Sequence, residues 1–218
     1  MSRPLSALFL TLIALLAGGC VETRFEAPLG DNIETCDSRW KGLWFEAGAK
    51  AGDPDAERVG MHVDEACALT LIEQPAAGAP LKRWRVPINF VHLRSGDYLV
   101  VADTALRGLG EIAPPYGIEP VPAKSYFFVK YRVRGDRLEL YEVDSAKAAR
   151  LVIDGKLEGT VQKNRSDLHV YVRGGRAQMV ELVRRHDLFG SKPWHVFQRS
   201  RLELQDFERS LQAPGAKR

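Results

Sequence analysis

The stretch S-Y-F-F-V-K-Y-R-V-R-G-D-R-L-E-L-Y, from Ser125 to Tyr141, decides the fold. Up to Arg134, one set of alternate side chains is apolar and the other set ends in cations, which is typical of a strand with one face in water. Gly135-Asp136 then predicts a two-residue hairpin turn. Folding at this turn pairs apolar side chains on one face, Val133 with Leu138 and Tyr131 with Leu140. On the other face it pairs opposite charges, Arg132 with Glu139. A slip of one residue would lose both matches, so we predict this register.

Further strands are expected on both sides of this hairpin. Their apolar patterns cover residues 39–46, 68–73, 84–93, 98–102, 157–163, 168–173 and 196–204. Pro87 lies inside one of these runs, and proline cannot donate a ladder hydrogen bond. We therefore expect an edge or a bulge at that point.

Two segments have helical rather than strand spacing. Residues 145–153 follow Asp144 or Ser145 as an N-cap and end before Gly155. Residues 176–187 place four side chains on one face: Met179, Leu182, Val183 and His186. The order of elements predicts an α+β fold that is mainly antiparallel β, a meandering curled sheet or partial barrel with two short helices in the C-terminal half.

The N-terminus has the three parts of an export signal. Arg3 precedes an apolar run over residues 5–16, and the small residues of L-L-A-G-G-C, Leu15 to Cys20, follow it. Twelve apolar residues are too few to cross a bilayer as a helix, which needs about twenty. The segment resembles the bacterial lipoprotein signal, with Gly19 at the small position and Cys20 at the lipidated one.

This resemblance implies a cellular location and a lipid anchor. In lipoproteins the cysteine thiol receives a diacylglycerol, the signal is cleaved, and the new amino group is acylated, with palmitate as a usual chain. Val21 in the next position, where an aspartate tends to retain lipoproteins in the inner membrane, implies the outer membrane, facing the periplasm. We therefore expect a signal peptide over residues 1–19, a lipidated cysteine with a flexible tether over 20–35, one globular domain over 36–206 and a tail over 207–218.

Composition is that of an ordinary globular protein, with 45% apolar residues. Without residues 1–19, which contain Arg3 and no acid, the chain has 30 lysines and arginines and 28 acids, a net charge near +2. No global field therefore favours nucleic acid, and we expect none as a partner. With Cys20 lipidated, Cys36 and Cys67 remain, and an oxidising compartment predicts a disulfide between them. Two free buried thiols are the alternative.

The segment W-K-G-L-W, Trp40 to Trp44, contains Gly-x-Trp on the first predicted strand of the domain. It resembles the first motif of lipocalins, in which the tryptophan packs at the closed end of a barrel under an arginine of the last strand. Arg199 or Arg201 is expected to supply that cation–π contact. We take Trp44, with Trp84 in the basic run K-R-W-R, as candidate binding residues; a tryptophan that only anchors the core is the alternative.

No motif points to catalysis. The sequence lacks Gly-x-Ser-x-Gly, HExxH, Cys-x-x-Cys and phosphate-binding glycine loops. We predict no catalytic residue, no cofactor and no metal, and a binding module whose partner beyond the membrane is a small amphipathic ligand or an envelope protein. Two other interpretations stay open: an immunity or inhibitor lipoprotein against a periplasm-acting toxin, and an envelope hydrolase using His186 or His195.

Overall fold

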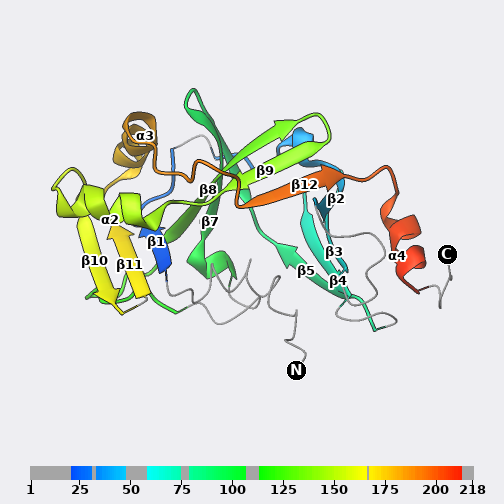
Figure 1. Ribbon diagram of the computed structural model, residues 1–218, viewed down its shortest axis with the longest axis horizontal. Coiled ribbons are helices and arrows are strands. Elements are labelled where there is room, and N and C mark those ends of the chain that lie inside the picture. Colours follow the sequence, from blue (N-terminus) through cyan, green and yellow to red (C-terminus); the bar gives the residue numbers. More distant parts are fainter. Residues whose placement is uncertain are drawn as a thin grey trace.

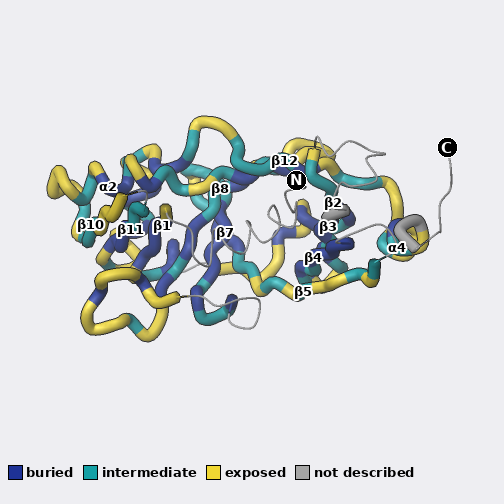
Figure 2. The backbone as a smooth tube through the Cα atoms, turned by 60° about the horizontal axis from the view of Figure 1, so that its bottom comes forward, coloured by how far each residue is buried: buried dark blue, intermediate teal, exposed yellow. Residues whose placement is uncertain are grey.

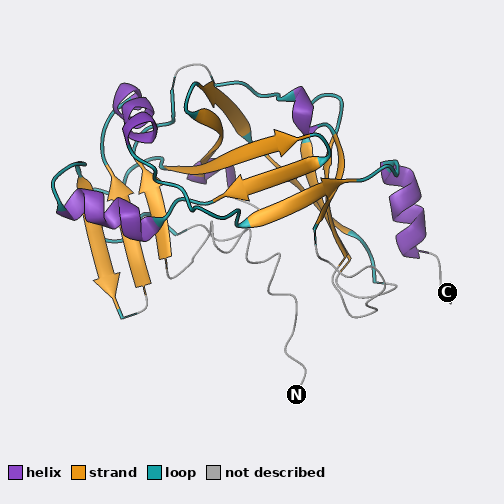
Figure 3. Ribbon diagram, turned by 45° about the horizontal axis from the view of Figure 1, so that its top comes forward, coloured by secondary structure: helices purple, strands orange, loops and turns teal. Residues whose placement is uncertain are grey.

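The computed structural model describes residues 21–30, 33–47, 58–74, 79–106, 113–165 and 167–212. Cys20, the predicted lipidation site, lies outside this range. Twelve strands form one mixed, mainly antiparallel sheet, and three short α-helices lie in the C-terminal half of the chain (Figure 1). The helices α2 and α3 lie at the end of the molecule that holds β10, β11 and β1, while α4 lies at the opposite end (Figure 3).

The strands follow one another as β1 Val21–Phe25, β2 Gly42–Glu46, β3 Arg58–Val63, β4 Leu69–Gln74, β5 Lys82–Val86, β6 Asn89–Leu93, β7 Gly96–Ala102, β8 Tyr126–Arg134, β9 Arg137–Tyr141, β10 Gly159–Asn164, β11 Asp167–Val172 and β12 His195–Arg199. The helices are α2 Ser145–Ile153, α3 Arg176–Arg185 and α4 Leu204–Gln212, with 3₁₀ turns η1 Ser38–Trp40 and η2 Asp103–Leu106.

The predicted hairpin is confirmed residue by residue. β8 and β9 pair antiparallel with Val133 opposite Leu138, Tyr131 opposite Leu140 and Arg132 opposite Glu139. Gly135 takes a positive φ of 57° in the turn, a conformation that glycine adopts without steric cost. The ladder therefore follows from local alternation and turn chemistry alone.

The sheet does not close, contrary to the expectation of a curled sheet or partial barrel. Its order is β10-β11-β1-β8-β9-β12-β2-β3-β4-β5, with β6 and β7 attached on the other edge of β8. Within the described residues β5 pairs only with β4 and β6 only with β7, so the hydrogen-bonded path stays open. Pro87 lies in the two-residue break between β5 and β6, which agrees with the irregularity predicted there.

Both predicted helices are present, and a third was not predicted. α2 begins at an Asp144 cap, whose carboxylate accepts a hydrogen bond from the Lys147 backbone N–H, and Gly155 follows its end. α3 buries Met179, Leu182 and Val183 as expected. The helix α4 occupies a region expected to be strand and tail, and it buries Phe207 against Phe45 with ring centroids 4.7 Å apart.

The segment expected to be a flexible tether contributes a strand to the middle of the sheet. Val21–Phe25 forms β1, which pairs in parallel with β11 and touches β8 at Phe25 and Tyr126. Its side chains from Glu22 to Phe25 are buried. The sequence of this segment shows no strand period that local reasoning detects, and its long-range pairing supplies the order instead.

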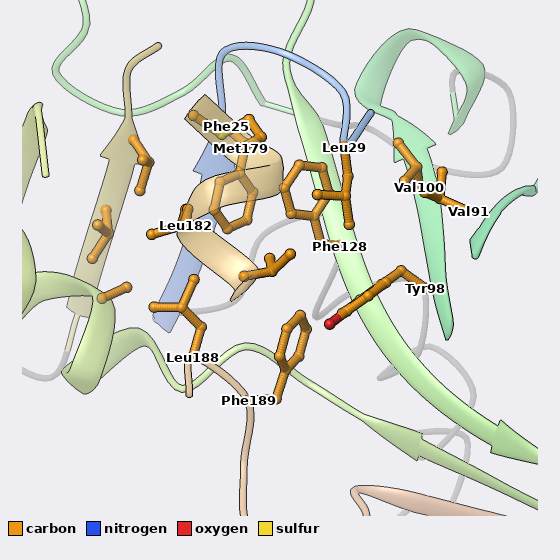
Figure 4. Packing of buried hydrophobic residues seen from close by; sticks show 14 of the residues in the cluster. Phe25, Leu29, Val91, Tyr98, Val100, Phe128, Met179, Leu182, Leu188 and Phe189 are labelled. Atoms are coloured by element: carbon orange, nitrogen blue, oxygen red, sulfur yellow. The ribbon is translucent and has the colours of Figure 1, made fainter. Parts of the chain in front are cut away.

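Two hydrophobic clusters lie on opposite faces of β8. One cluster packs α2 and α3 onto the outer face of β1, β8 and β11, with Phe25 and Phe128 stacked at 4.0 Å between ring centroids (Figure 4). The other lies within β2–β4, β8, β9 and β12 and holds Trp40, Trp44 and Tyr131. Buried residues accordingly lie along β1 and β7, whereas exposed residues lie in the connecting loops and in the end strands β5 and β10 (Figure 2).

The predicted disulfide is present, joining Cys36 and Cys67 across 31 residues of sequence. It ties the segment before η1 to the β3–β4 turn. We predict that the double variant Cys36→Ser/Cys67→Ser loses about 3–4 kcal/mol of unfolding free energy, because an open loop of this length gains entropy in the unfolded chain. Urea denaturation followed by tryptophan fluorescence measures this loss, and a reducing agent should produce the same shift in the wild type. An unchanged urea midpoint in both would contradict the prediction.

Candidate functional site

The candidate site arises where two strands share one edge of β8. β7 pairs along one edge of β8. On the other edge, β1 pairs at Tyr126 and β9 pairs from Lys130 onward. A cleft lies along the β8 edge where β1 and β9 separate, lined on one side by β1 and on the other by residues 142–146, which follow β9.

Backbone polar groups line the bottom of this cleft. The Asp103 N–H donates to the Ser125 carbonyl at 2.9 Å, and strand backbone groups alternate between the two edges. Even-numbered residues of β8 therefore direct their N–H and C=O groups toward the β1 and β9 edge. Phe128 falls between the two ladders, and none of the described strands pairs with it on that edge.

The cleft has a volume of about 570 Å³ and mainly apolar walls. Strands β1, β8 and β11, the start of α2 and the segment before β12 contribute to it. Its apolar lining residues include Val21, Phe127, Phe128, Val129, Val143, Leu168 and Trp194. Its size and lining suit one mainly apolar group.

The charged groups that line the cleft are all acidic. Glu22, Glu142 and Asp144 line it, and no lysine, arginine or histidine among the described residues does. Desolvation at the cleft wall raises the pKa of Glu142, an effect that the nearby His195 opposes. An anionic ligand is therefore disfavoured here, while a neutral or cationic one is accepted.

Glu22 is held by a buried arginine behind the cleft. Both Nε and Nη2 of Arg24 donate to Glu22 Oε2 at 3.0 Å, and Arg24 Nη1 lies 3.9 Å from Asp103 Oδ2. His169 Nδ1 lies 3.2 Å from the other Glu22 oxygen. Arg24 also stacks on Phe127, 4.9 Å from the ring centroid. A buried charge is tolerated only when paired in this way, so this cluster positions the wall of the cleft.

The Gly-x-Trp segment has the predicted arginine contact. The Arg199 guanidinium carbon lies 4.2 Å from the centre of the Trp44 ring, and its nitrogens donate to the carbonyls of Arg39 and Lys41. Gly42 has a φ of +112°, and a Cβ there would come within 3.1 Å of the Arg199 side chain. Glycine is thus required at this position by both conformation and space.

Neither tryptophan chosen from the sequence lies in the cleft. Trp44 is fully buried beneath Arg199, and Trp84 packs half-buried against the same cluster. Trp194 lines the cleft instead. The only signal for it in the sequence is an aromatic residue within the G-S-K-P-W segment, because the walls of the cleft come from segments far apart in the chain.

A second polar cluster fastens the disulfide segment to the sheet. Asp37 accepts hydrogen bonds from Arg39 Nη2 at 2.7 Å and from the Tyr131 hydroxyl at 2.5 Å, and Arg39 also pairs with Asp97 at 2.8 Å. His92 Nδ1 lies 2.8 Å from Asp97. Burial acts to raise the pKa of Asp37, but the hydrogen bonds from Arg39 and Tyr131 outweigh it, so the pKa lies below its ordinary value. Burial and the bond to Asp37 raise the pKa of Tyr131.

The two histidines considered for hydrolysis stand apart from any nucleophile. His195 Nδ1 lies 2.6 Å from Glu46 Oε1, and its ring lies against Trp194 at 4.2 Å. His186 caps the end of α3. In the part of the chain that the structure describes, no hydroxyl or thiol is hydrogen-bonded to either ring, and no group of three metal-binding side chains occurs. None of the described helices has both the length and the apolar character needed to span a membrane.

Comparisons with protein-family models, with curated proteins and with solved structures find no match to this chain. Its candidate site therefore stands on the geometry of the cleft.

The Asp37 cluster predicts a pH-dependent stability. Asp37→Asn should lower the unfolding free energy by about 1.5–3 kcal/mol at pH 7, the range for hydrogen bonds to charged groups. Because the fold lowers the pKa of Asp37, its carboxylate contributes stability above about pH 4, and that contribution is lost as pH falls through the folded pKa.

Urea titrations of the wild type and Asp37→Asn from pH 7 to pH 3 measure the difference, which should narrow below about pH 4. The control is Asp154→Asn, an exposed carboxylate 3.8 Å from Lys156, which should change little because exposed ion pairs contribute little. A difference that stays constant across this pH range would contradict the assignment.

Proposed function

We propose that the protein is a non-catalytic lipoprotein of the outer membrane, anchored through Cys20 and facing the periplasm, that binds an amphipathic ligand in the cleft between β1 and β9. The observation that carries the proposal is the cleft itself. Its walls are apolar, its charged groups are acidic, and it begins at Val21, one residue after Cys20.

The chemistry of the cleft specifies the class of ligand. Apolar side chains favour an alkyl or acyl chain, since burying such a chain contributes about 0.8 kcal/mol per CH₂ group. Glu142 and Asp144 at the cleft favour a neutral or cationic head group over an anionic one. The Phe128 backbone can in addition hydrogen-bond an amide or hydroxyl group of the ligand.

The lipoprotein part of the proposal is supported by the L-L-A-G-G-C segment and by the disulfide. Disulfides persist in oxidising compartments such as the periplasm. The Cys36–Cys67 bond agrees with export of the chain.

A lipocalin-like Gly-x-Trp motif also belongs to the proposal, here on an open sheet. The contact of Arg199 with Trp44 and its close approach to Gly42 support it, and β5 and β6 pack side chains into the same cluster as Trp44. The ligand site lies outside that cluster, because Trp40, Phe90 and Tyr131 pack edge to face within it.

An inhibitor of a periplasm-acting toxin is the second candidate, and one observation favours it. Tyr116 is 55% exposed and stacks on His169 at 4.9 Å, and Val121 in the same segment is 51% exposed. Exposed aromatic residues on a loop are common anchors of protein interfaces. The hydrolase alternative has no comparable support, because His186 and His195 have no hydroxyl or thiol partner among the described residues.

The anchor is tested by the mass and the location of the protein. Wild-type protein purified from membranes should carry diacylglycerol and an acyl chain on Cys20, while Cys20→Ser should carry neither. Because Cys20→Ser lacks the lipid, it should be absent from the fraction that contains acylated protein. The matched control is Cys36→Ser/Cys67→Ser, which removes two other cysteines and should keep the lipid. An unmodified Cys20 thiol in the membrane form would contradict the proposal.

The ligand class is tested with two photoreactive probes that share one diazirine-bearing alkyl chain and differ in the head group, an ammonium or a carboxylate. Added to membranes that hold the protein, the ammonium probe should label the cleft segments around Trp194 and Leu168 several-fold more than the carboxylate probe, relative to labelling elsewhere on the chain. Peptide mass spectrometry measures the labelling.

Ala146→Trp supplies the test of location, since Ala146 is exposed and lines the cleft. It should reduce cleft labelling several-fold, while Ala177→Trp, at an equally exposed position in the first turn of α3, should not. If both probes label the cleft equally and Ala146→Trp does not change the labelling, the ligand proposal is contradicted. The inhibitor candidate then becomes the proposed function.

A further inference from the structure

We propose that one of the acyl chains attached to Cys20 occupies the cleft between β1 and β9 of the same molecule, so that the lipid anchor regulates the ligand site. This inference rests on the proposed acylation of Cys20. It deepens the proposed function by naming an occupant and by giving the site a means of control.

The first support is the absence of a spacer. Strand β1 begins at Val21, and the side chain of Val21 lines the cleft while remaining 47% exposed. Consecutive Cα atoms lie about 3.8 Å apart, so a group on Cys20 starts within one residue of the cleft mouth. A tether of fifteen residues would separate a lipid on Cys20 from the cleft, whereas β1 begins at the residue directly after Cys20.

The second support is charge. Within the described part of the chain, the cleft is lined by Glu22, Glu142 and Asp144 and by no lysine, arginine or histidine, while Arg24 and Lys147 beside it pair with Glu22 and Asp144. A free fatty acid or an anionic phospholipid would bring a negative charge toward these carboxylates. An acyl chain joined to Cys20 through a thioether-linked glycerol or an amide has no charge at its attachment point. Among sources of an acyl chain, the cleft therefore favours the one on Cys20.

The third support is the number of chains that anchoring requires. The lipoprotein resemblance implies three acyl chains on Cys20, and two are enough for stable attachment to a bilayer. Moving the third chain from the bilayer into an apolar cleft keeps its CH₂ groups out of water in both places. It also removes water from the partly exposed Val21, Leu168 and Trp194 residues, which is favourable.

Occupancy by this chain makes the site self-regulating. A ligand that enters the cleft displaces the acyl chain into the bilayer, and the affinity measured for the ligand is reduced by the fraction of molecules whose cleft is occupied. Displacement also places the third chain in the membrane and so strengthens the anchor.

The test uses cells that make the full chain and are fed a diazirine-labelled palmitic acid, which the acylation pathway attaches to Cys20. After irradiation, mass spectrometry of the purified protein measures both the modification of Cys20 and the residues to which its chain has crosslinked. We expect crosslinks within one molecule to the segments that hold Phe128, Leu168 and Trp194.

Two variants locate the crosslink. Ala146→Trp narrows the cleft at an exposed position and should reduce these crosslinks several-fold, while Ala177→Trp, its counterpart on α3, should leave them unchanged. An acylated Cys20 whose chain crosslinks only to lipid, or crosslinks equally in both variants, would overturn this inference and leave the proposed anchor intact. An unmodified Cys20 would overturn both.

Discussion

One strand with three partners organises this protein. β8 pairs with β7 along one edge, and β1 and β9 divide the other edge between them. A strand has only two edges, so β1 and β9 must separate beyond the point where the first ladder ends and the second begins. The branch produces an open sheet with a hydrophobic cluster on each face of β8, and it produces the cleft, whose floor is the unshared part of the β8 edge.

The branch depends on a strand that brings charged side chains into the interior. Glu22 and Arg24 alternate with Thr23 and Phe25 along β1, so one face of the strand packs against α2 and α3 while the other carries an ion pair. Burying two charges is costly, and removing one partner would leave the other uncompensated. The bonds from Arg24 to Glu22 and the stacking on Phe127 offset that cost and hold β1 in place. The same bonds orient one wall of the cleft, so its shape depends on a buried charge cluster as well as on strand pairing.

The other half of the molecule is held by different means. The Cys36–Cys67 disulfide, the Asp37 cluster and the Arg199 contact with Trp44 all lie near η1. These contacts connect the segment that precedes β2 with strands β3, β4, β6, β7 and β8. A short 3₁₀ turn has too little packing surface to hold this segment in place by itself. Under the proposed function, the two ends of the molecule then have separate tasks. The disulfide end contains the covalent and polar cross-links, and the end that begins at Val21 carries the cleft and, in this proposal, the lipid.

Local patterns in the sequence determined the β8–β9 register, helices α2 and α3, the irregularity at Pro87 and the residue partners of the disulfide. In each case the deciding residues are close in sequence or belong to a short list, as with the Gly135 turn and the three cysteines. Tertiary structure decided the remainder. β1 is a strand only because β11, almost 150 residues later, pairs with it, and Phe207 belongs to a helix that packs onto Phe45 rather than to a tail. The cleft requires Val21, Phe128, Leu168 and Trp194 to meet, and no period or motif links residues so far apart. Alternation and capping act between neighbouring residues. Which strands pair with the β8 edge instead depends on competition between segments far apart in the sequence, so the complete fold determines it.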